Sequence, residues 1–173
     1  MSYHISEIKE KLKVSVSDFR LPRYAELPNM GLYLEQVVRY INGFLLGVGC
    51  AEITLSMVSN YVKKGIVSPP QKKQYYADQI AELIFIEIAK NAISLENVVE
   101  LFEMRRRGFT MPMAYDYFCA EFENMLAFVF GLKQKPEENL GVTKTEEKEI
   151  LRNVIISVSN SMYLNALFSE MKN

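Results

Sequence analysis

The stretch 54-TLSMVSNYVKKGIVSPPQKKQYYADQI-80 decides the expected fold of this chain. It carries four lysines, at positions 63, 64, 72 and 73, and no acidic residue before Asp78. The whole chain of 173 residues nevertheless has a formal net charge of −1 and a pI of about 6.0. Positive charge is therefore concentrated in one segment, and a site for an anionic partner would be local to it.

Residues 54–64 have the periodicity of a helix with two different faces. Apolar residues recur at spacings of three and four and predict a buried side: Leu55, Val58 and Val62. The opposite side is a stripe of small hydrogen-bonding residues that ends in a cation: Ser56, Ser59, Asn60 and Lys63. Thr54 suits the N-cap of this helix, and Gly65 suits the left-handed position after its last turn.

A polar helix face of this kind can enter the major groove of DNA, where Asn pairs with adenine edges and Ser serves donors or acceptors. The next segment, Pro69 to Tyr76, predicts a tight hairpin that would act as a wing against the phosphate backbone. The candidates for DNA contact are Ser56, Ser59, Asn60, Lys63, Lys64, Lys72, Lys73 and Tyr76. About four phosphate contacts would give a slope of log affinity against log salt near −3.6 per monomer.

The lysines also have a structural explanation. Cations near the C-terminus of a helix stabilise it through the helix dipole by about 0.3–1 kcal/mol. Lysines are common in surface turns as well. The spacing of these residues alone therefore leaves both interpretations open.

A resemblance to a known superfamily favours DNA binding. The run MVSNYVKKGIVSPPQKKQYYADQIAELIFIEIAKNAISLENV resembles the DNA-binding domain of the mercury-resistance regulator (MerR) superfamily. The matching positions follow the order helix end, apolar pair, wing and two further helices: Tyr61, Gly65, Ile66, Val67, Pro69, Lys72, Lys73, Tyr76, Ile80, Leu83, Ile86, Ser94, Leu95 and Glu96. The resemblance implies a winged helix-turn-helix over roughly residues 54–99.

The wider chain, from 21-LPRYAELPNMGLYLEQVVRYIN-42 onwards, resembles the bacterial domain of unknown function 1836 family. That family is usually described as carrying this type of helix-turn-helix, so the resemblance implies a fold and no activity. The first hypothesis is a DNA-binding transcriptional regulator. The second is a protein-interaction module that keeps the fold without binding DNA, because the rest of the chain is acidic and Ser56 and Ser59 stand where the superfamily often has arginines.

The expected fold class is mainly all-α, with a MerR-like winged helix-turn-helix, a short β-hairpin wing and C-terminal helices. Periodicity and caps predict further helices: around Ile5 to Leu12, roughly 30–47, 78–91, from Ser94 to Arg107 and from Pro112 to about 130. Thr143 and Glu146 predict a capping box that opens a long last helix. Residues 21–28 are expected to be extended, and two short extended pieces, Ile66–Val67 and Gln74–Tyr76, are expected around a turn.

Three parts are expected along the chain: an N-terminal helical extension (1–20), the helix-turn-helix domain (21–106) and a C-terminal helical region for dimerisation or effector binding (107–173). The last helix is expected either to cover the core or to form a homodimer seam. Aromatic and methionine side chains between Met111 and Phe130 either fill the core or line a pocket for an unknown small-molecule effector. The arginines 105–107 either compensate the helix dipole or contact a second phosphate.

Catalysis and metal binding are not expected. The chain has two cysteines, Cys50 and Cys119, and one histidine, His4, with no metal-ligand spacing. Glu121 and Glu123 are two residues apart, so they lie on different helix faces and cannot act as an acid–base pair. We expect no enzyme activity, no cofactor and a buried, inert Cys119. Without an apolar run of signal-peptide or membrane-helix length, a cytoplasmic protein without membrane contact is expected.

Overall fold

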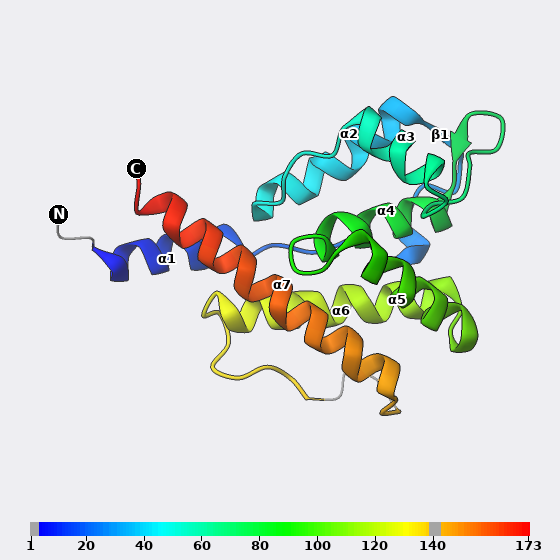
Figure 1. Cartoon of the computed structure of the whole chain (residues 1–173). Coiled ribbons are helices and arrows are strands. Elements are labelled where there is room, and N and C mark those ends of the chain that lie inside the picture. The colour runs from blue at the N-terminus through cyan, green and yellow to red at the C-terminus, as the bar shows by residue number, and fades with distance from the viewer. Residues whose placement is uncertain (1–3, 139–142) are drawn as a thin grey trace.

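The computed structural model describes residues 4–138 and 143–173. The fold is mainly helical with one small two-stranded antiparallel sheet (Figure 1). In chain order the elements are α1 (Ile5–Ser15), the 3-10 turn η1 (Tyr24–Glu26), β1 (Leu32–Tyr33), α2 (Leu34–Leu45), the 3-10 turn η2 (Leu46–Val48), α3 (Leu55–Lys63), β2 (Gln74–Tyr75), α4 (Ala77–Ala89), α5 (Leu95–Gly108), α6 (Met111–Val129) and α7 (Glu146–Glu170).

Helix α4 is the centre of the core. Every residue from Gln79 to Ala89 is buried, because this helix lies between the α2–α3 pair and helices α6 and α7 (Figure 1). Aromatic rings join it to α6: the centroid of Phe85 is 4.9 Å from that of Phe118, which stacks on Phe122 at 6.0 Å. A helix that is covered on all sides, as this one is, is stable only inside such a core.

The sheet joins two segments that are far apart in the chain. Leu32 pairs with Tyr75, and Tyr33 pairs with Gln74, in antiparallel register. A Cβ added at Gly31 would lie 2.7 Å from the Cβ of Gln74, so the close approach of these backbones requires glycine there. The prediction of a second extended piece at Ile66 and Val67 is wrong, because both residues lie in a bend after α3 and β2 pairs with β1 instead.

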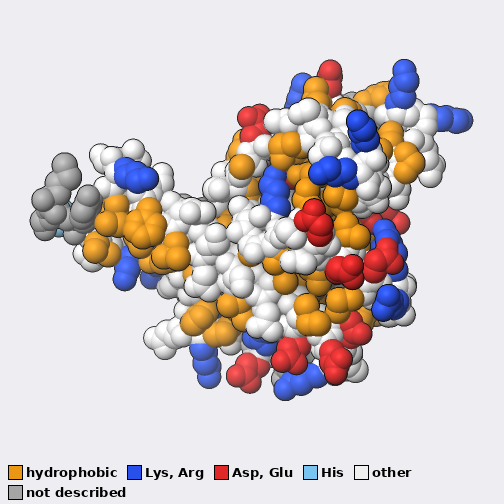
Figure 2. All heavy atoms as spheres, in the orientation of Figure 1, with side chains coloured by type: hydrophobic (Ala, Val, Ile, Leu, Met, Phe, Trp, Pro, Cys, Tyr) orange, Lys and Arg blue, Asp and Glu red, His pale blue; other side chains and the backbone are white. Residues whose placement is uncertain are grey.

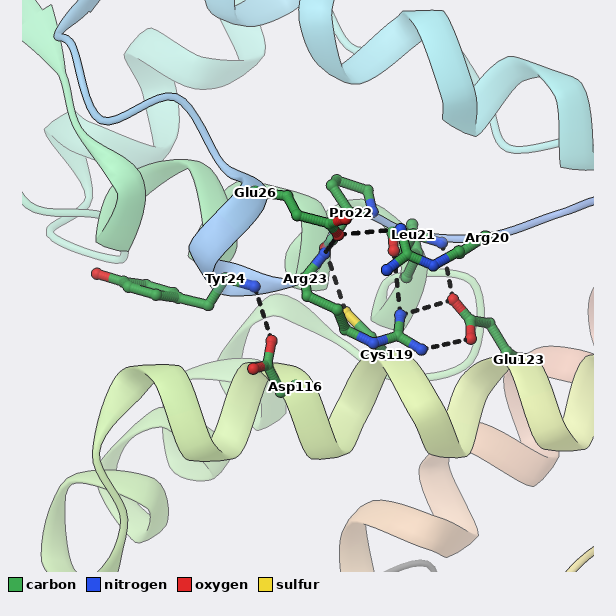
Figure 3. Close-up of polar contacts among 9 residues, drawn as sticks. All are labelled: Arg20, Leu21, Pro22, Arg23, Tyr24, Glu26, Asp116, Cys119 and Glu123. Carbon is green, nitrogen blue, oxygen red and sulfur yellow. Dashed lines mark hydrogen bonds and ion pairs between the residues drawn. The ribbon is translucent and has the colours of Figure 1, made fainter.

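A polar cluster fastens the segment before β1 to α6 (Figure 3). Arg23 donates from Nη1 and Nη2 to the two carboxylate oxygens of Glu123, over 2.8 Å and 2.7 Å. The N–H of Leu21 also donates to Glu123, and the N–H of Tyr24 donates to Asp116 over 2.7 Å. The segment is mostly extended, as predicted, with η1 as a short turn.

Helix α6 presents its two central carboxylates to different neighbours. Glu123 faces Arg23, whereas Glu121 is buried with Arg152 of α7, whose Nε lies 3.2 Å from Oε1 of Glu121. This confirms that the two glutamates lie on different helix faces. Each one instead joins α6 to a different part of the chain.

The structure confirms the N-caps predicted at Thr54 and Ser94 and contradicts the one predicted at Thr143. Thr54 and Ser94 are confirmed as N-caps, since their hydroxyl oxygens accept from the N–H of Met57 and Asn97 over 3.3 Å and 3.2 Å. The cap predicted at Thr143 is wrong, because Thr145 accepts from the N–H of the residue three positions on, Lys148. Thr145 stands directly before the first helical residue, which is where a capping side chain can reach the free N–H groups. Part of the predicted polar loop, residues 139–142, lies outside the described residues.

Helix α1 and the C-terminal turns of α7 extend away from the rest of the molecule as a two-helix arm (Figure 1). Leu12 of α1 and Val16, which follows the helix, are buried in the core, and Lys11 forms an ion pair with Glu170. The arm exposes several apolar side chains to solvent: Ile5, Val14, Leu164 and Phe168.

Candidate nucleic-acid interface

Helix α3 turns its polar stripe to solvent. Val58 and Tyr61 are buried against the core, while the stripe that the sequence predicts is fully on the outside: Ser56, Ser59, Asn60 and Lys63. The hydroxyl of Ser56 lies 3.1 Å from that of Thr54, so it takes part in the N-terminal cap. The side chains of the other three stripe residues make no hydrogen bond or ion pair with any described residue.

The connection between α2 and α3 is longer than a tight turn, but side-chain hydrogen bonds hold it in place. The amide of Asn42 donates to the carbonyl of Ile53 and accepts from its N–H, both over 3.0 Å. Cys50 and Ile53 are buried below the connection. A side-chain amide that satisfies both backbone groups of one residue fixes the entry of the chain into α3.

The end of α3 follows the predicted pattern. Gly65 has a φ of 72°, in the left-handed region that glycine adopts without strain. The N–H of Ile66 reaches back to the carbonyl of Tyr61 over 2.9 Å, which closes the last turn of the helix. Lys63 and Lys64 are both exposed at this end.

Lys72 and Lys73 form the tip of a two-residue turn. Gln71 and Gln74 exchange both backbone hydrogen bonds across it, over 3.0 Å and 2.9 Å. The φ angles of Lys72 and Lys73 are 48° and 66°, which is the arrangement of a type I′ turn. Two adjacent lysines in the left-handed region are unusual, because Asn-Gly adopts this turn with less strain.

Gln79, near the start of α4, fastens the segment before this turn. Its side-chain amide donates to the carbonyls of Ser68 and Pro69 over 2.8 Å and 3.0 Å, and its oxygen accepts from the N–H of Tyr76 over 2.9 Å. Gln79 is buried, so these bonds are shielded from water. Tyr76 is exposed and donates from its hydroxyl to Gln74 over 3.3 Å.

All eight predicted contact residues are exposed, and they belong to one continuous stretch at one end of the molecule. Lys and Arg side chains project from the end that carries α3 and β1 (Figure 2). Acidic residues also lie close to this surface, among them the exposed Asp78 and Glu96. The pKa of Glu96 is lowered by its own backbone N–H, by the hydroxyl of Ser94 and by the charge of Lys64. Part of the positive field of Lys64 is thus offset by Glu96.

Three polar residues that position this surface were missed in the sequence: the half-buried Asn42 and the buried Gln79 and Glu87. Glu87 accepts a hydrogen bond from the hydroxyl of Tyr61 and pairs with Lys90. A polar residue inside an apolar helical run, as Glu87 is, signals a buried partner, but the sequence does not say which one.

The described residues offer no candidate for metal chemistry, since none of their His, Cys, Asp and Glu side chains form a group of three or more that could hold an ion. Burial raises the pKa of the two thiols, Cys50 and Cys119, to about 12 each. Within residues 4–138 and 143–173, no helix combines the length and the apolar character that crossing a bilayer requires.

Comparisons with known proteins give a family and no activity. Searches of the curated proteins and of the solved structures found no match. One family model matches residues 22–118, which covers more than half of the chain and runs from the segment before β1 through α6 as far as Phe118. The chain therefore belongs to the family described as Domain of unknown function (DUF1836).

Proposed function

We propose that this chain is a DNA-binding transcriptional regulator in which α2 and α3 form a MerR-like helix-turn-helix and residues 69–76 form its wing. The observation that carries the proposal is the exposed stripe of α3, in which Ser59, Asn60 and Lys63 make no side-chain hydrogen bond or ion pair with any described residue, beside the lysine-bearing turn. A stripe that served only to solubilise the helix would have no need of an ordered turn next to it.

In this arrangement the stripe and the lysines have different tasks. Ser56, Ser59 and Asn60 face the edges of the bases, where short polar side chains read donors and acceptors. The lysines contact phosphates and supply affinity that depends on salt. Tyr76 at the base of the wing completes the backbone contacts.

The geometry of the wing supports a functional role. Lys72 and Lys73 both adopt positive φ, a conformation that costs roughly 1–2 kcal/mol for each residue with a Cβ. Strain of this kind is commonly found at binding sites, where a side chain is needed at a position that glycine would occupy more easily. The turn projects two lysine side chains from the end of the two-stranded sheet, where a flanking phosphate backbone would lie.

We further propose that the two-helix arm of α1 and α7 forms the homodimer contact. The arm exposes Val14 to 69%, Leu164 to 47% and Phe168 to 54%. Exposed apolar surface of this kind is typical of sites that bind another protein. A second copy of the chain would cover it and duplicate α3 about a two-fold axis. Proteins that read the major groove with one helix commonly bind two half-sites in this way.

A second candidate function is the binding of a protein by the same end of the molecule. Met30, Tyr33 and Leu55 are exposed to 75%, 54% and 42% there, and apolar side chains of this size are typical of protein interfaces. The proximity of Glu96 to Lys64 also weakens the attraction for a polyanion.

The test is fluorescence anisotropy with labelled genomic duplexes at several salt concentrations. We expect a slope of log affinity against log salt near −3.6 per monomer, and a slope reduced by about 1.8 in the Lys72→Glu/Lys73→Glu variant. The matched control, Lys135→Glu/Lys144→Glu, changes the net charge equally at exposed residues outside α3 and its wing.

Two results would contradict DNA binding: the absence of a salt-sensitive complex, or equal weakening by the wing variant and the control. Retention of one protein partner on the immobilised chain, without any DNA complex, would instead favour the interaction module. The Leu55→Ser variant separates the two functions, because it removes an apolar contact and leaves the lysines unchanged.

A further inference from the structure

A pocket of about 520 Å³ lies between α4, α5, α6 and the first turns of α7, far along the chain from the α3 stripe. Its volume is in the range of small-molecule sites. The sequence left open whether the aromatic and methionine residues after position 110 fill the core or line a pocket. The structure divides them: Phe122 is in the core, whereas Met111, Met113 and Tyr117 line the pocket together with Phe85 and Phe102.

Two charged side chains in the pocket lack hydrogen-bond partners. Glu82 is 5% exposed and forms no hydrogen bond with any described residue. Its nearest cation is Arg105, whose Nη2 lies 3.9 Å away, too far for a hydrogen bond. The Nε of Arg105 is buried and also has no partner among the described residues. A buried donor without a partner and a carboxylate without a hydrogen bond therefore stand side by side.

The pairing of these two groups is weak compared with other ion pairs of the chain. Arg23 and Glu123 form two direct hydrogen bonds, as charged groups of this kind do when nothing else has to fit between them. Burial raises the pKa of Glu82, although the charges of Arg106 and Arg105 oppose this effect. An unsatisfied buried polar group in a native structure indicates a missing partner.

Other charged groups at the pocket already have partners. Asp116 accepts from the N–H of Tyr24 over 2.7 Å. The Nζ of Lys148 lies 5.1 Å from the ring centroid of Tyr117 and donates to the carbonyl of Thr143 over 2.9 Å. Glu147 is exposed at the rim. The charged groups inside the pocket that are left to bind a ligand are thus Glu82 and Arg105, and the buried hydroxyl of Tyr115 also lacks a partner among the described residues.

We propose that this pocket binds a small, flat, apolar molecule with a neutral amide head group. The amide carbonyl accepts from an N–H of the Arg105 guanidinium group, and the amide N–H donates to the carboxyl group of Glu82. The aromatic body lies among Phe85, Phe102 and Met111, which line the pocket. This site goes beyond the proposed DNA contact and does not depend on it.

The charges decide the type of head group. A carboxylate ligand would place a second negative charge beside Glu82, and an ammonium ligand would face the guanidinium group of Arg105. A neutral amide offers one acceptor and one donor side by side, so it satisfies both residues without adding a charge. Water molecules alone would satisfy the polar atoms and leave the apolar remainder of the pocket in contact with solvent.

The test uses three probes that share one aromatic body: 2-naphthamide, 2-naphthoate and 2-naphthylmethylammonium. Binding to the full chain is measured by titration calorimetry, and the site is located by two-dimensional NMR of backbone amides. We expect the amide to bind with a Kd below about 1 mM and at least about tenfold more tightly than either charged probe. Amide signals of Leu101 and Arg105 should shift, whereas those of Ser59 and Lys72 should not.

The matched variants are Arg105→Met and Arg107→Met, which remove neighbouring arginines of the same helix. Arg107 is exposed and does not line the pocket. We expect the first variant to weaken naphthamide binding about tenfold and the second to change it less than about twofold. The proposal is overturned if no probe binds, if a charged probe binds as tightly as the amide, or if the shifted signals of the unmodified chain lie outside the pocket.

Discussion

The hydroxyl of Tyr61 on α3 donates a buried hydrogen bond of 2.9 Å to the carboxylate of Glu87 on α4. Glu87 is only 1% exposed, and its other oxygen pairs with Lys90. The bond ties the inner side of α3 to the central helix of the core and so fixes the rotation of α3 about its own axis. The outward direction of Ser59 and Asn60 depends on this contact.

Replacing Tyr61 with Phe should reduce the free energy of unfolding by about 1.5–3 kcal/mol, because it leaves the buried Glu87 carboxylate without one of its donors. Urea unfolding followed by circular dichroism measures the loss. Tyr33→Phe is the control, since Tyr33 is exposed and its change should stay within about 0.5 kcal/mol. Equal stability of Tyr61→Phe and the unmodified chain would show that the bond does not hold α3.

Replacing Lys72-Lys73 with Asn-Gly should raise the free energy of unfolding by about 1 kcal/mol, because Asn-Gly adopts the type I′ turn with less strain. The same variant should bind DNA more weakly under the proposed function, since it removes two cations. Thermal unfolding and anisotropy measured on the same samples separate these effects. A variant that is both less stable and less able to bind would point to damage of the turn rather than to loss of charge.

Glu121→Gln should alter the pH dependence of stability. Burial raises the pKa of Glu121, although the charge of Arg152 and the amide of Asn124 oppose this effect. The folded chain therefore binds the proton more tightly than the unfolded chain, and the contribution of Glu121 to stability falls as the pH rises through its folded pKa. The difference in unfolding free energy should shift in favour of the variant as the pH rises above about 4.5.

Unfolding in urea at several pH values provides the measurement for this variant. Glu149→Gln on the exposed side of α7 is its control for the loss of one charge. If the two variants have parallel pH profiles, burial of Glu121 does not decide the effect.

The thiols of Cys50 and Cys119 should resist chemical modification in the folded chain. Both are buried, and a pKa of about 12 leaves only about one thiol in ten thousand ionised at pH 8. A disulfide reagent should therefore react at a rate set by unfolding, and both thiols should react promptly in urea. Fast modification of either cysteine in the native chain would contradict the buried positions.

Changing Leu164 and Phe168 together to Asp should convert the proposed dimer to a monomer, because the substitutions place charges on the exposed apolar side of the arm. Light scattering after size-exclusion chromatography measures the mass. The control is Ser157→Asp/Asn160→Asp, which adds the same charge to exposed polar residues of α7. A monomeric unmodified chain at all concentrations would reject the dimer.

The local features of α3 could be predicted from the sequence because a few neighbouring residues encode them. The apolar spacing predicts the buried side, which is confirmed at Val58 and wrong at Leu55, a residue that is 42% exposed at the first turn. Thr54 and Gly65 mark the ends through caps that act within one turn. The same reasoning failed at Thr143, where Thr145 was an equally suitable cap two residues on. Where two nearby residues are equally suitable as N-cap, the packing of the helix decides at which of them it begins.

Contacts between distant segments were decided by the tertiary structure alone. The sequence by itself determined most of the helices and which side of α3 is polar, since helical periodicity and capping are properties of adjacent residues. Its prediction of a helix from about residue 30 is wrong at Leu32 and Tyr33, which form strand β1. It did not determine that Leu32 pairs with Tyr75, or that Glu82 and Arg105 meet in one pocket. These contacts form because burial of the whole core selects one arrangement of the helices, and that selection depends on the combined packing of every segment.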